Sequence, residues 1–174
     1  MMKQDRKWLW SALAIPFLCL VIVAVKPVTT LLFGEEIILS TAPVDPTDLF
    51  YGDYLILSYD ISEAPAKIVD EEVKTADYSE AANKAIYLWL EPKNNISSLT
   101  RVSFEKPSDS LYLKAEFTNI WHNEEADTYN IPLPWDRYYV PENHGEEWEK
   151  RAMTGDILVH MKVRNGFAVP TSIE

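Results

Sequence analysis

GDYLILSYDI, residues 52–61, is the stretch of sequence that decides the fold class. Its larger apolar side chains fall at every second position, namely at Leu55, Leu57, Tyr59 and Ile61. An extended chain points successive side chains to opposite faces, so this spacing gives one apolar face and is typical of a half-buried β-strand. The stretch predicts that the surrounding domain is mainly β.

Further strands are predicted on both sides of this stretch, at residues 36–41, 86–91, 99–104, 111–120, 135–140, 155–163 and 167–173. Asn94-Asn95 and Asn165-Gly166 have the composition of tight hairpin turns. Residues 62–83 are polar and are predicted to form a long loop with about one helical turn. Strong helix formers predict a short helix at residues 146–152. Short strands with one or two short helices describe an antiparallel barrel-like or sandwich-like β domain.

One faint internal repeat relates YGDYLILSYDI at residues 51–61 to TGDILVHMKVR at residues 154–164. Both segments place Gly-Asp ahead of an alternating strand. Two independent entries from a turn into a strand explain the likeness. A duplicated barrel unit explains it as well.

The N-terminal segment is predicted to be a transmembrane anchor over residues 8–33. Residues 8–25 contain no charged side chain, and as a helix they measure about 27 Å, close to the thickness of a hydrocarbon core. The only cysteine, Cys19, lies inside this run, so the rest of the chain has no disulfide. A cleaved signal peptide is the rival interpretation, but no small-x-small triplet closes the apolar run.

Charge predicts the orientation of the anchor. Residues 1–7 form a basic tail with Lys3, Arg6 and Lys7 against Asp5, whereas the chain as a whole has a formal net charge of −11. The positive-inside bias keeps such a tail cytoplasmic. Residues 34–174 are therefore expected to form an extracytoplasmic domain at the cell membrane.

The predicted domain is strongly acidic. Residues 34–174 hold 12 basic and 26 acidic side chains, which gives a formal net charge of −14. A field of this sign repels nucleic acid, so nucleic-acid binding is excluded as a function class. A basic partner, a cation or plain solubility fits this charge better.

Two blocks of the sequence resemble a family named for its motif, the GDYXXLXY proteins. The first block is GDYLILSY with the preceding PVDPTDLF, and the second is RYYVPENHGEEWEK at residues 137–150. The residues that carry the resemblance are Pro43, Asp45, Pro46, Asp48, Gly52, Asp53, Tyr54, Leu57, Tyr59, Tyr138, Tyr139, Val140, Pro141, Glu142, Gly145 and Glu149.

This resemblance implies a membrane localisation and a kind of partner. The family consists of membrane-anchored bacterial proteins without an assigned activity, often encoded beside an uncharacterised multi-pass membrane protein. It implies a lipid-embedded anchor and a multi-pass partner in the same membrane. It carries over no catalytic residue and no cofactor, and it leaves the oligomeric state open.

A serine protease site fails at its nucleophile. PTDLFYGDYLIL also resembles the Pro-Thr-Leu-x-x-Gly-Asp stretch of signal-peptidase-like enzymes, whose serine lies three residues before that proline. Pro43 occupies the corresponding position here, and without a hydroxyl there is nothing for a lysine base to activate.

Acidic residues and histidines are weaker candidates for a cation-binding, hydrolytic or metal site. Asp45, Asp48 and Asp53 lie close enough in sequence to ligate a cation, although such carboxylates more often bind turn amides. Paired acids for hydrolysis are found in Glu142 with Glu146 or Glu149, without a cleft to support them. The histidines, His122, His144 and His160, are scattered, so no metal site is assigned.

An aromatic group is the preferred interaction surface. It comprises Trp135, Tyr138, Tyr139 and Trp148 around a proline-containing segment. Core packing explains such residues, and so does a recognition surface, because Tyr and Trp dominate interface hot spots.

Two function hypotheses follow from the sequence. The first is a membrane-tethered extracytoplasmic accessory or interaction module without catalysis, acting with an integral membrane partner. The alternative is an envelope enzyme or a small-ligand or cation-binding domain, with a site built from Asp53, Glu142 and other acidic residues.

Overall fold

The computed structural model describes residues 3–43, 54–139 and 145–174 of the 174-residue chain. The helices are α1 (Lys3–Phe33), η1 (Asp60–Ser62), η2 (Ala66–Ile68), α2 (Glu71–Lys74), α3 (Tyr78–Ala81) and α4 (Gly145–Thr154). The strands are β1 (Glu35–Ala42), β2 (Tyr54–Ile56), β3 (Ser58–Tyr59), β4 (Glu63–Pro65), β5 (Ala85–Lys93), β6 (Ile96–Ser103), β7 (Tyr112–Glu116), β8 (Trp121–Asn123), β9 (Thr128–Asn130), β10 (Arg137–Tyr139), β11 (Leu158–Arg164) and β12 (Phe167–Ile173).

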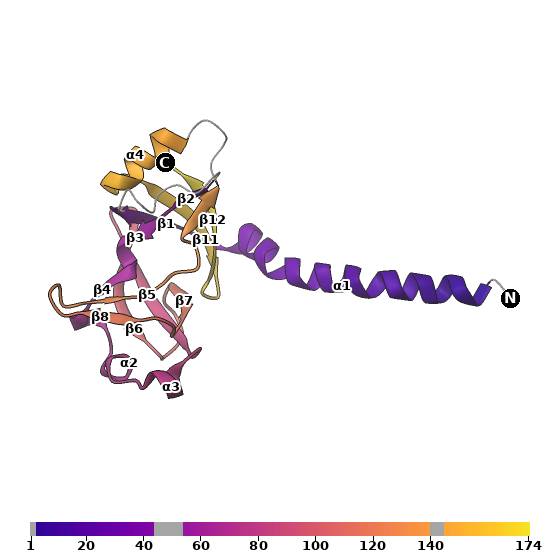
Figure 1. Ribbon diagram of the computed structural model, residues 1–174, viewed down its shortest axis with the longest axis horizontal. Helices are drawn as coiled ribbons and strands as arrows, with labels where there is room; N and C mark the ends of the chain where they lie inside the picture. The colour runs from indigo at the N-terminus through magenta and orange to yellow at the C-terminus, as the bar shows by residue number, and fades with distance from the viewer. Residues whose placement is uncertain (1–2, 44–53, 140–144) are drawn as a thin grey trace.

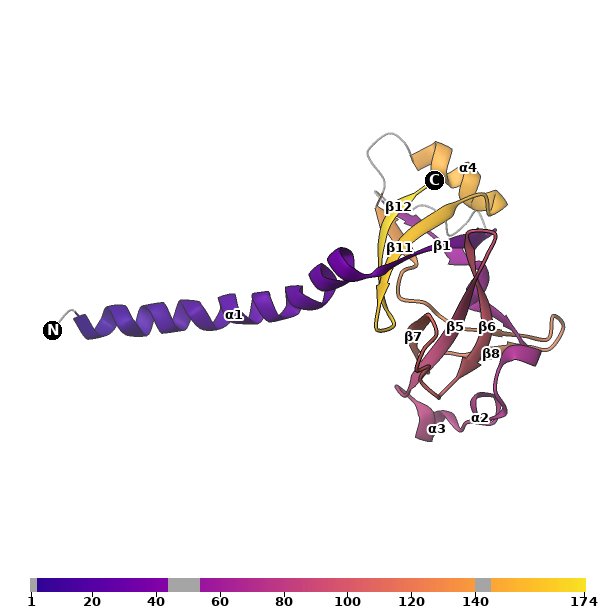
Figure 2. The ribbon, with the colours of Figure 1, turned by 180° about the vertical axis from the view of Figure 1, so that it is seen from behind.

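Helix α1 projects away from the rest of the molecule (Figures 1 and 2). Its segment Ala12–Phe33 is apolar, is exposed over most of its length, and at 22 residues is long enough to cross a bilayer. Pro16 and Pro27 lie inside the helix. The length and composition of this segment suit a membrane anchor or a signal sequence.

The rest of the structure is mainly β, as predicted. Its strands form a four-stranded sheet in the order β12-β11-β1-β3, a β10-β2 ribbon, and two three-stranded sheets in the orders β4-β9-β8 and β6-β5-β7. Every pairing between these strands is antiparallel. Figure 1 shows α4 and the four-stranded sheet in the upper half of the domain, and β4–β8 with α2 and α3 in the lower half. Strand β1 packs on β6 and so joins the halves.

The stretch at residues 52–61 confirms its predicted alternation within the described part, because Leu55, Leu57, Tyr59 and Ile61 are all buried. It does not form one continuous strand. β2 pairs with β10 and β3 pairs with β1, and between them the Leu57 amide donates a hydrogen bond to the Asp136 carbonyl at 2.7 Å. One alternating segment therefore joins two sheets.

The two predicted hairpin turns are confirmed. Asn94 and Asn95, between β5 and β6, have φ values of 53° and 69°, and Asn165 and Gly166, between β11 and β12, have φ values of 52° and 77°. Positive φ at both central residues is the mark of a type I′ turn, which asparagine and glycine adopt at least cost. These turns fix the registers of the two longest hairpins.

The prediction of a long loop at residues 62–83 was too simple. The segment forms β4, η2, α2 and α3, and its side chains Val69, Val73 and Ala81 are buried in the core. Arg101 on β6 holds the segment through a bidentate contact with Asp70, in which Nε donates to Oδ1 at 2.9 Å and Nη2 donates to Oδ2 at 2.7 Å. These buried side chains and the Arg101–Asp70 contact anchor the segment to the domain.

Three predicted strands are shorter than expected. The strand predicted at residues 111–120 stops at Glu116, ahead of Asn119, which has a φ of 50°. That at 135–140 begins at Arg137, after Trp135, whose side chain is buried. That at 155–163 begins at Leu158, after Gly155 with a φ of 68°.

The segments of the faint repeat flank the same strand. β3 and β11 both pair with β1 and lie on either side of it in the four-stranded sheet. This arrangement suits either origin of the likeness, which stays open.

Candidate functional site

The last two turns of α1 pack against the hairpin formed by β11 and β12. The Lys26 ammonium lies 4.2 Å from the centre of the Phe167 ring, and the Arg164 guanidinium lies 5.9 Å from that of Phe33. Both distances are within the range of cation–π attraction. Thr30 on the same helix is 1% exposed. The end of the helix is therefore part of the domain's packing.

Gly34 is the whole connection between α1 and β1. Its amide donates a 2.8 Å hydrogen bond to the Thr30 carbonyl, which closes the helix. A Cβ atom at Gly34 would collide with that carbonyl oxygen and lie 3.1 Å from the backbone of Val163. Only glycine fits this close approach, so the chain passes from helix to strand with no linker.

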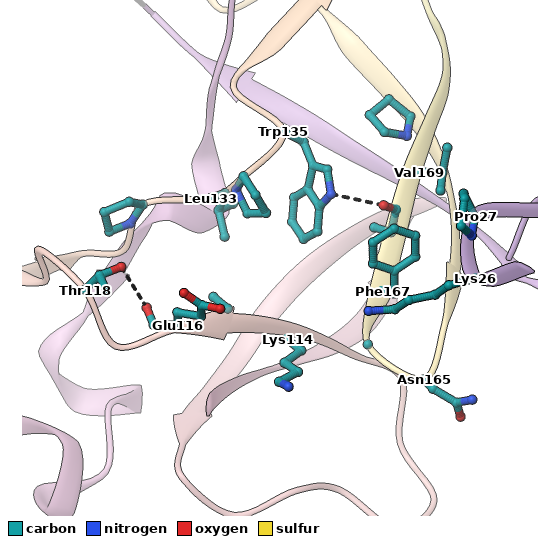
Figure 3. Close-up of a pocket in the computed structure, with 16 residues that line it drawn as sticks. Lys26, Pro27, Lys114, Glu116, Thr118, Leu133, Trp135, Asn165, Phe167 and Val169 are labelled. Atoms are coloured by element: carbon teal, nitrogen blue, oxygen red, sulfur yellow. Dashed lines mark hydrogen bonds between the residues drawn. The ribbon is translucent and has the colours of Figure 1, made fainter. Parts of the chain in front are cut away.

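A pocket of 760 Å³ opens beside this junction, between α1, the β11–β12 hairpin, β7 and the segment at residues 132–135 (Figure 3). Its lining comprises Lys26, Pro27, Lys114, Ala115, Glu116, Thr118, Pro132, Leu133, Pro134, Trp135, Asn165, Gly166, Phe167, Ala168, Val169 and Pro170. Most of these side chains are apolar. The volume lies within the range of small-molecule binding sites, about 300–1,000 Å³.

Trp135 forms one wall of the pocket and is held at both ends. Its indole Nε1 donates to the Ala168 carbonyl at 3.0 Å, as Figure 3 shows, and its carbonyl accepts a 2.7 Å hydrogen bond from the Tyr59 hydroxyl. Burial raises the pKa of Tyr59 above the ordinary tyrosine value, so the phenol keeps its proton and remains a donor. A buried tyrosine of the first sequence block thus positions the pocket wall.

Three charged side chains line the pocket. Lys114 and Glu116 lie two residues apart on β7, so their side chains project from the same face of that strand. The backbone amide of Lys114 donates a 2.8 Å hydrogen bond to the Gly166 carbonyl. In Figure 3 the Lys26 stem runs beneath Phe167, with Lys114 below the pocket and Glu116 on the Leu133 side. In this view, Lys26 and Lys114 lie nearer Asn165 of the hairpin turn than Glu116 does, and Lys114 points away from Trp135.

The two sequence blocks also meet in space, in the β2–β10 ribbon. Tyr138 pairs with Leu55 and Tyr139 with Tyr54. The Tyr54 and Tyr139 rings lie 6.0 Å apart, edge to face, and the Arg137 guanidinium lies 5.4 Å from the Tyr54 ring. We call Tyr54, Arg137 and Tyr139 the ribbon surface, in which Tyr139 is 74% exposed.

The sequence model of the GDYXXLXY protein family matches residues 16–173, nearly the whole chain. The chain belongs to the GDYXXLXY family. No curated protein and no solved structure matches it. In this GDYXXLXY protein, the motif that names the family therefore supplies Tyr54 to the ribbon surface, Leu57 to the core and Tyr59 to the support of Trp135.

The remaining family positions divide between described and undescribed residues. Pro43 lies beside Gly155, where a Cβ atom would stand 3.0 Å from the proline Cδ, and Gly145 begins α4. Glu149 lies within that helix. The other positions lie outside the described residues: Asp45, Pro46, Asp48, Gly52, Asp53, Val140, Pro141 and Glu142. The cation hypothesis and the acidic site with Asp53 and Glu142 both fall there.

The structure narrows the predicted aromatic surface. Trp135 is only 9% exposed and belongs to the core and the pocket wall. Tyr138 and Trp148 are partly buried and pack against the core, with the Arg151 guanidinium 4.7 Å from the Trp148 ring. Of the four predicted residues, Tyr139 is the one that is widely exposed.

The described histidines pair with carboxylates. His122 lies 3.3 Å from Asp127, and His160 lies 3.5 Å from Glu36 and 3.2 Å from Glu174. Hydrogen bonds from Lys162 and then His160 lower the pKa of Glu36. Within residues 3–43, 54–139 and 145–174, no group of three His, Cys, Asp or Glu residues is arranged to hold a metal ion.

The pocket was not predicted from the sequence. Its lining comes from four segments between Lys26 and Pro170, which no local pattern connects. Pro132 and Pro134 interrupt the alternating pattern ahead of Trp135, and Pro170 lies within the strand predicted at residues 167–173, so none of the three indicates a pocket. Asn165-Gly166 was recognised as a turn, with no sign that it faces the end of α1.

Proposed function

We propose that this GDYXXLXY protein is a single-pass, membrane-tethered accessory module without catalysis, whose acidic domain acts on the extracytoplasmic side together with an integral membrane partner. The observation that carries the proposal is the linker-free junction at Gly34, where the end of α1 packs on β11 and β12. Removal of α1 as a signal peptide would strip this packing from the domain. The junction therefore supports a retained anchor.

The charge distribution supports the orientation. Lys3, Arg6 and Lys7 precede the apolar segment, while the residues after Gly34 are strongly acidic. Basic residues next to a span are retained in the cytoplasm. This bias supports a domain on the extracytoplasmic side of the cell membrane.

The ribbon surface supports a protein partner. Figure 1 shows β2 near the edge of the domain from which α1 leaves, so a neighbour in the same bilayer has a short distance to bridge. Tyr139 offers an exposed ring beside Tyr54 and Arg137. Tyrosine and arginine are enriched at the energetic centres of interfaces.

The first test is topology and processing of the full chain. We expect a C-terminal alkaline phosphatase fusion to be active, a C-terminal green fluorescent protein fusion to stay dark, and the mature protein to remain in membranes with its N-terminus intact. A soluble, N-terminally trimmed product contradicts the anchor. A C-terminus that is protected from protease in spheroplasts contradicts the orientation.

The second test is co-purification from mild detergent with the multi-pass protein encoded nearby. We expect Tyr139→Ala to reduce recovery of that protein at least tenfold. Tyr78→Ala is the matched control, because Tyr78 is also exposed (54%) but lies on α3 in the opposite half of the domain. Equal recovery with wild type and Tyr139→Ala contradicts the ribbon surface as the contact, and absence of the multi-pass protein contradicts the partner.

A further inference from the structure

We propose that the 760 Å³ pocket beside the α1 junction binds one glycerophospholipid from the surrounding leaflet, with its phosphate at Lys26 and Lys114 and an acyl chain along Trp135 and Phe167. This inference rests on the proposed membrane span of α1. It does not depend on which side of the membrane the domain occupies, or on a protein partner.

The position of Lys26 sets the level of the pocket relative to a bilayer. Residues 8–25 are uncharged and measure about 27 Å as a helix, so Lys26 is the first charge after a segment that matches a hydrocarbon core. A lysine at such a boundary extends its ammonium to the headgroup zone. Since Lys26 and Pro27 line the pocket, a span over residues 8–25 would put the pocket at the level of lipid phosphates.

The charge of the pocket favours a phosphate. Lys26 and Lys114 contribute two ammonium groups against the single carboxylate of Glu116, in a domain whose overall charge is strongly negative. Neither lysine makes an ion pair with any residue that the structure describes, and the Lys26 contact with Phe167 leaves its N–H donors unpaired. Paired lysines and a phosphodiester are complementary in charge and hydrogen bonding.

The remainder of the lining favours hydrocarbon. Leu133, Trp135, Phe167 and Val169 supply apolar side chains. The pocket is also lined by prolines, namely Pro27, Pro132, Pro134 and Pro170. Proline has no backbone N–H, so these walls offer few donors that a hydrocarbon chain would leave unsatisfied. A phosphate at one end and an apolar wall at the other match a phospholipid better than a free phosphate.

The test measures lipid retention by native mass spectrometry of the full chain in detergent micelles, with dioleoylphosphatidylglycerol and dioleoylglycerol added in equal amounts. We expect the protein to retain one phosphatidylglycerol and little dioleoylglycerol, which has the same chains without the phosphate. Addition of glycerol 3-phosphate in excess should not displace the lipid. Displacement by it, or equal retention of both lipids, overturns the proposal.

Matched variants tie the retention to the pocket. We expect Lys114→Gln to lower the apparent affinity for phosphatidylglycerol about fivefold, and the double variant Lys26→Gln with Lys114→Gln to lower it further. Lys106→Gln is the control, because it makes the same change of charge at a lysine that contacts Tyr112 and does not line the pocket. Equal effects of Lys106→Gln and Lys114→Gln overturn the proposal.

Crosslinking locates the lipid. Phosphatidylglycerol with a diazirine in one acyl chain, incorporated in nanodiscs with the full chain, should label peptides that contain residues 132–135 and 165–170. Labelling confined to α1 overturns the proposal. Because a nanodisc presents both leaflets and holds no partner, this result is independent of the topology and co-purification tests, so the two proposals fail separately.

Discussion

Replacement of Tyr59 by phenylalanine removes one oxygen atom from the centre of the domain. Tyr59 is 1% exposed, and its hydroxyl donates a 2.7 Å hydrogen bond to the carbonyl of Trp135. The phenylalanine ring fills nearly the same space, so packing changes little. What changes is that the Trp135 carbonyl loses a buried hydrogen-bond donor.

The expected cost follows from that unsatisfied carbonyl. Leaving a buried acceptor without its partner costs about 1–3 kcal/mol. We therefore expect Tyr59→Phe to lower the free energy of unfolding of the domain by this amount, with an unchanged dependence on denaturant concentration. Trp135 is still fastened to Ala168 through its indole, so the fold itself should persist.

The assay is equilibrium urea unfolding of the full chain in detergent, followed by tryptophan fluorescence and by circular dichroism. Tyr54→Phe is the control, because it makes the same chemical change in the same motif at a hydroxyl with no hydrogen bond to any described residue. We expect Tyr54→Phe to stay within about 0.5 kcal/mol of wild type. Equal losses in the two variants would refute the reasoning, as would an unchanged stability of Tyr59→Phe.

Three further predictions concern ion pairs and the helix junction. The Lys162 hydrogen bond lowers the pKa of Glu36, so Glu36 stabilises the fold above the ordinary glutamate pKa and loses that contribution as pH falls. The difference in stability between wild type and Glu36→Gln should therefore shrink toward zero in acid. The urea midpoint of each protein, measured against pH, tests this. Arg101→Lys cannot keep the bidentate contact with Asp70 and should lower the free energy of unfolding by about 0.5–1 kcal/mol. Lys74→Arg, at a pair joined by a single hydrogen bond to Glu71, should change this free energy little in the same urea titration. Gly34→Ala places a methyl group against the Thr30 carbonyl and should lower the free energy of unfolding by about 1–3 kcal/mol. Hydrogen exchange at the end of α1 should become faster, and unchanged exchange there would contradict the close approach.

The parts of the fold that were predictable are those encoded by neighbouring residues. The alternation from Leu55 to Ile61 identified a buried face, and Asn165-Gly166 identified a hairpin, because both signals are complete within a few positions. The break between β2 and β3 was not visible. It depends on partners that are distant in sequence, because β2 pairs with β10 and β3 pairs with β1.

The site was less predictable than the fold. Tyr139 was among the residues chosen for an interaction surface and is exposed, but Trp135 in the same group is buried. The difference depends on Tyr59 and Ala168, which bind the two ends of Trp135 from distant segments. Aromatic composition alone cannot separate a ring on the surface from one that is fastened inside.

The direct passage from α1 into β1 through Gly34 has a mechanical consequence. A domain on a flexible linker adopts many orientations relative to its helix, whereas the single-residue junction and the packing of α1 hold this domain in one orientation relative to α1. With α1 in a bilayer, as we propose, rotation of the helix about its own axis would turn the whole domain with it. A membrane protein that binds α1 would therefore determine which face of the domain is turned toward it.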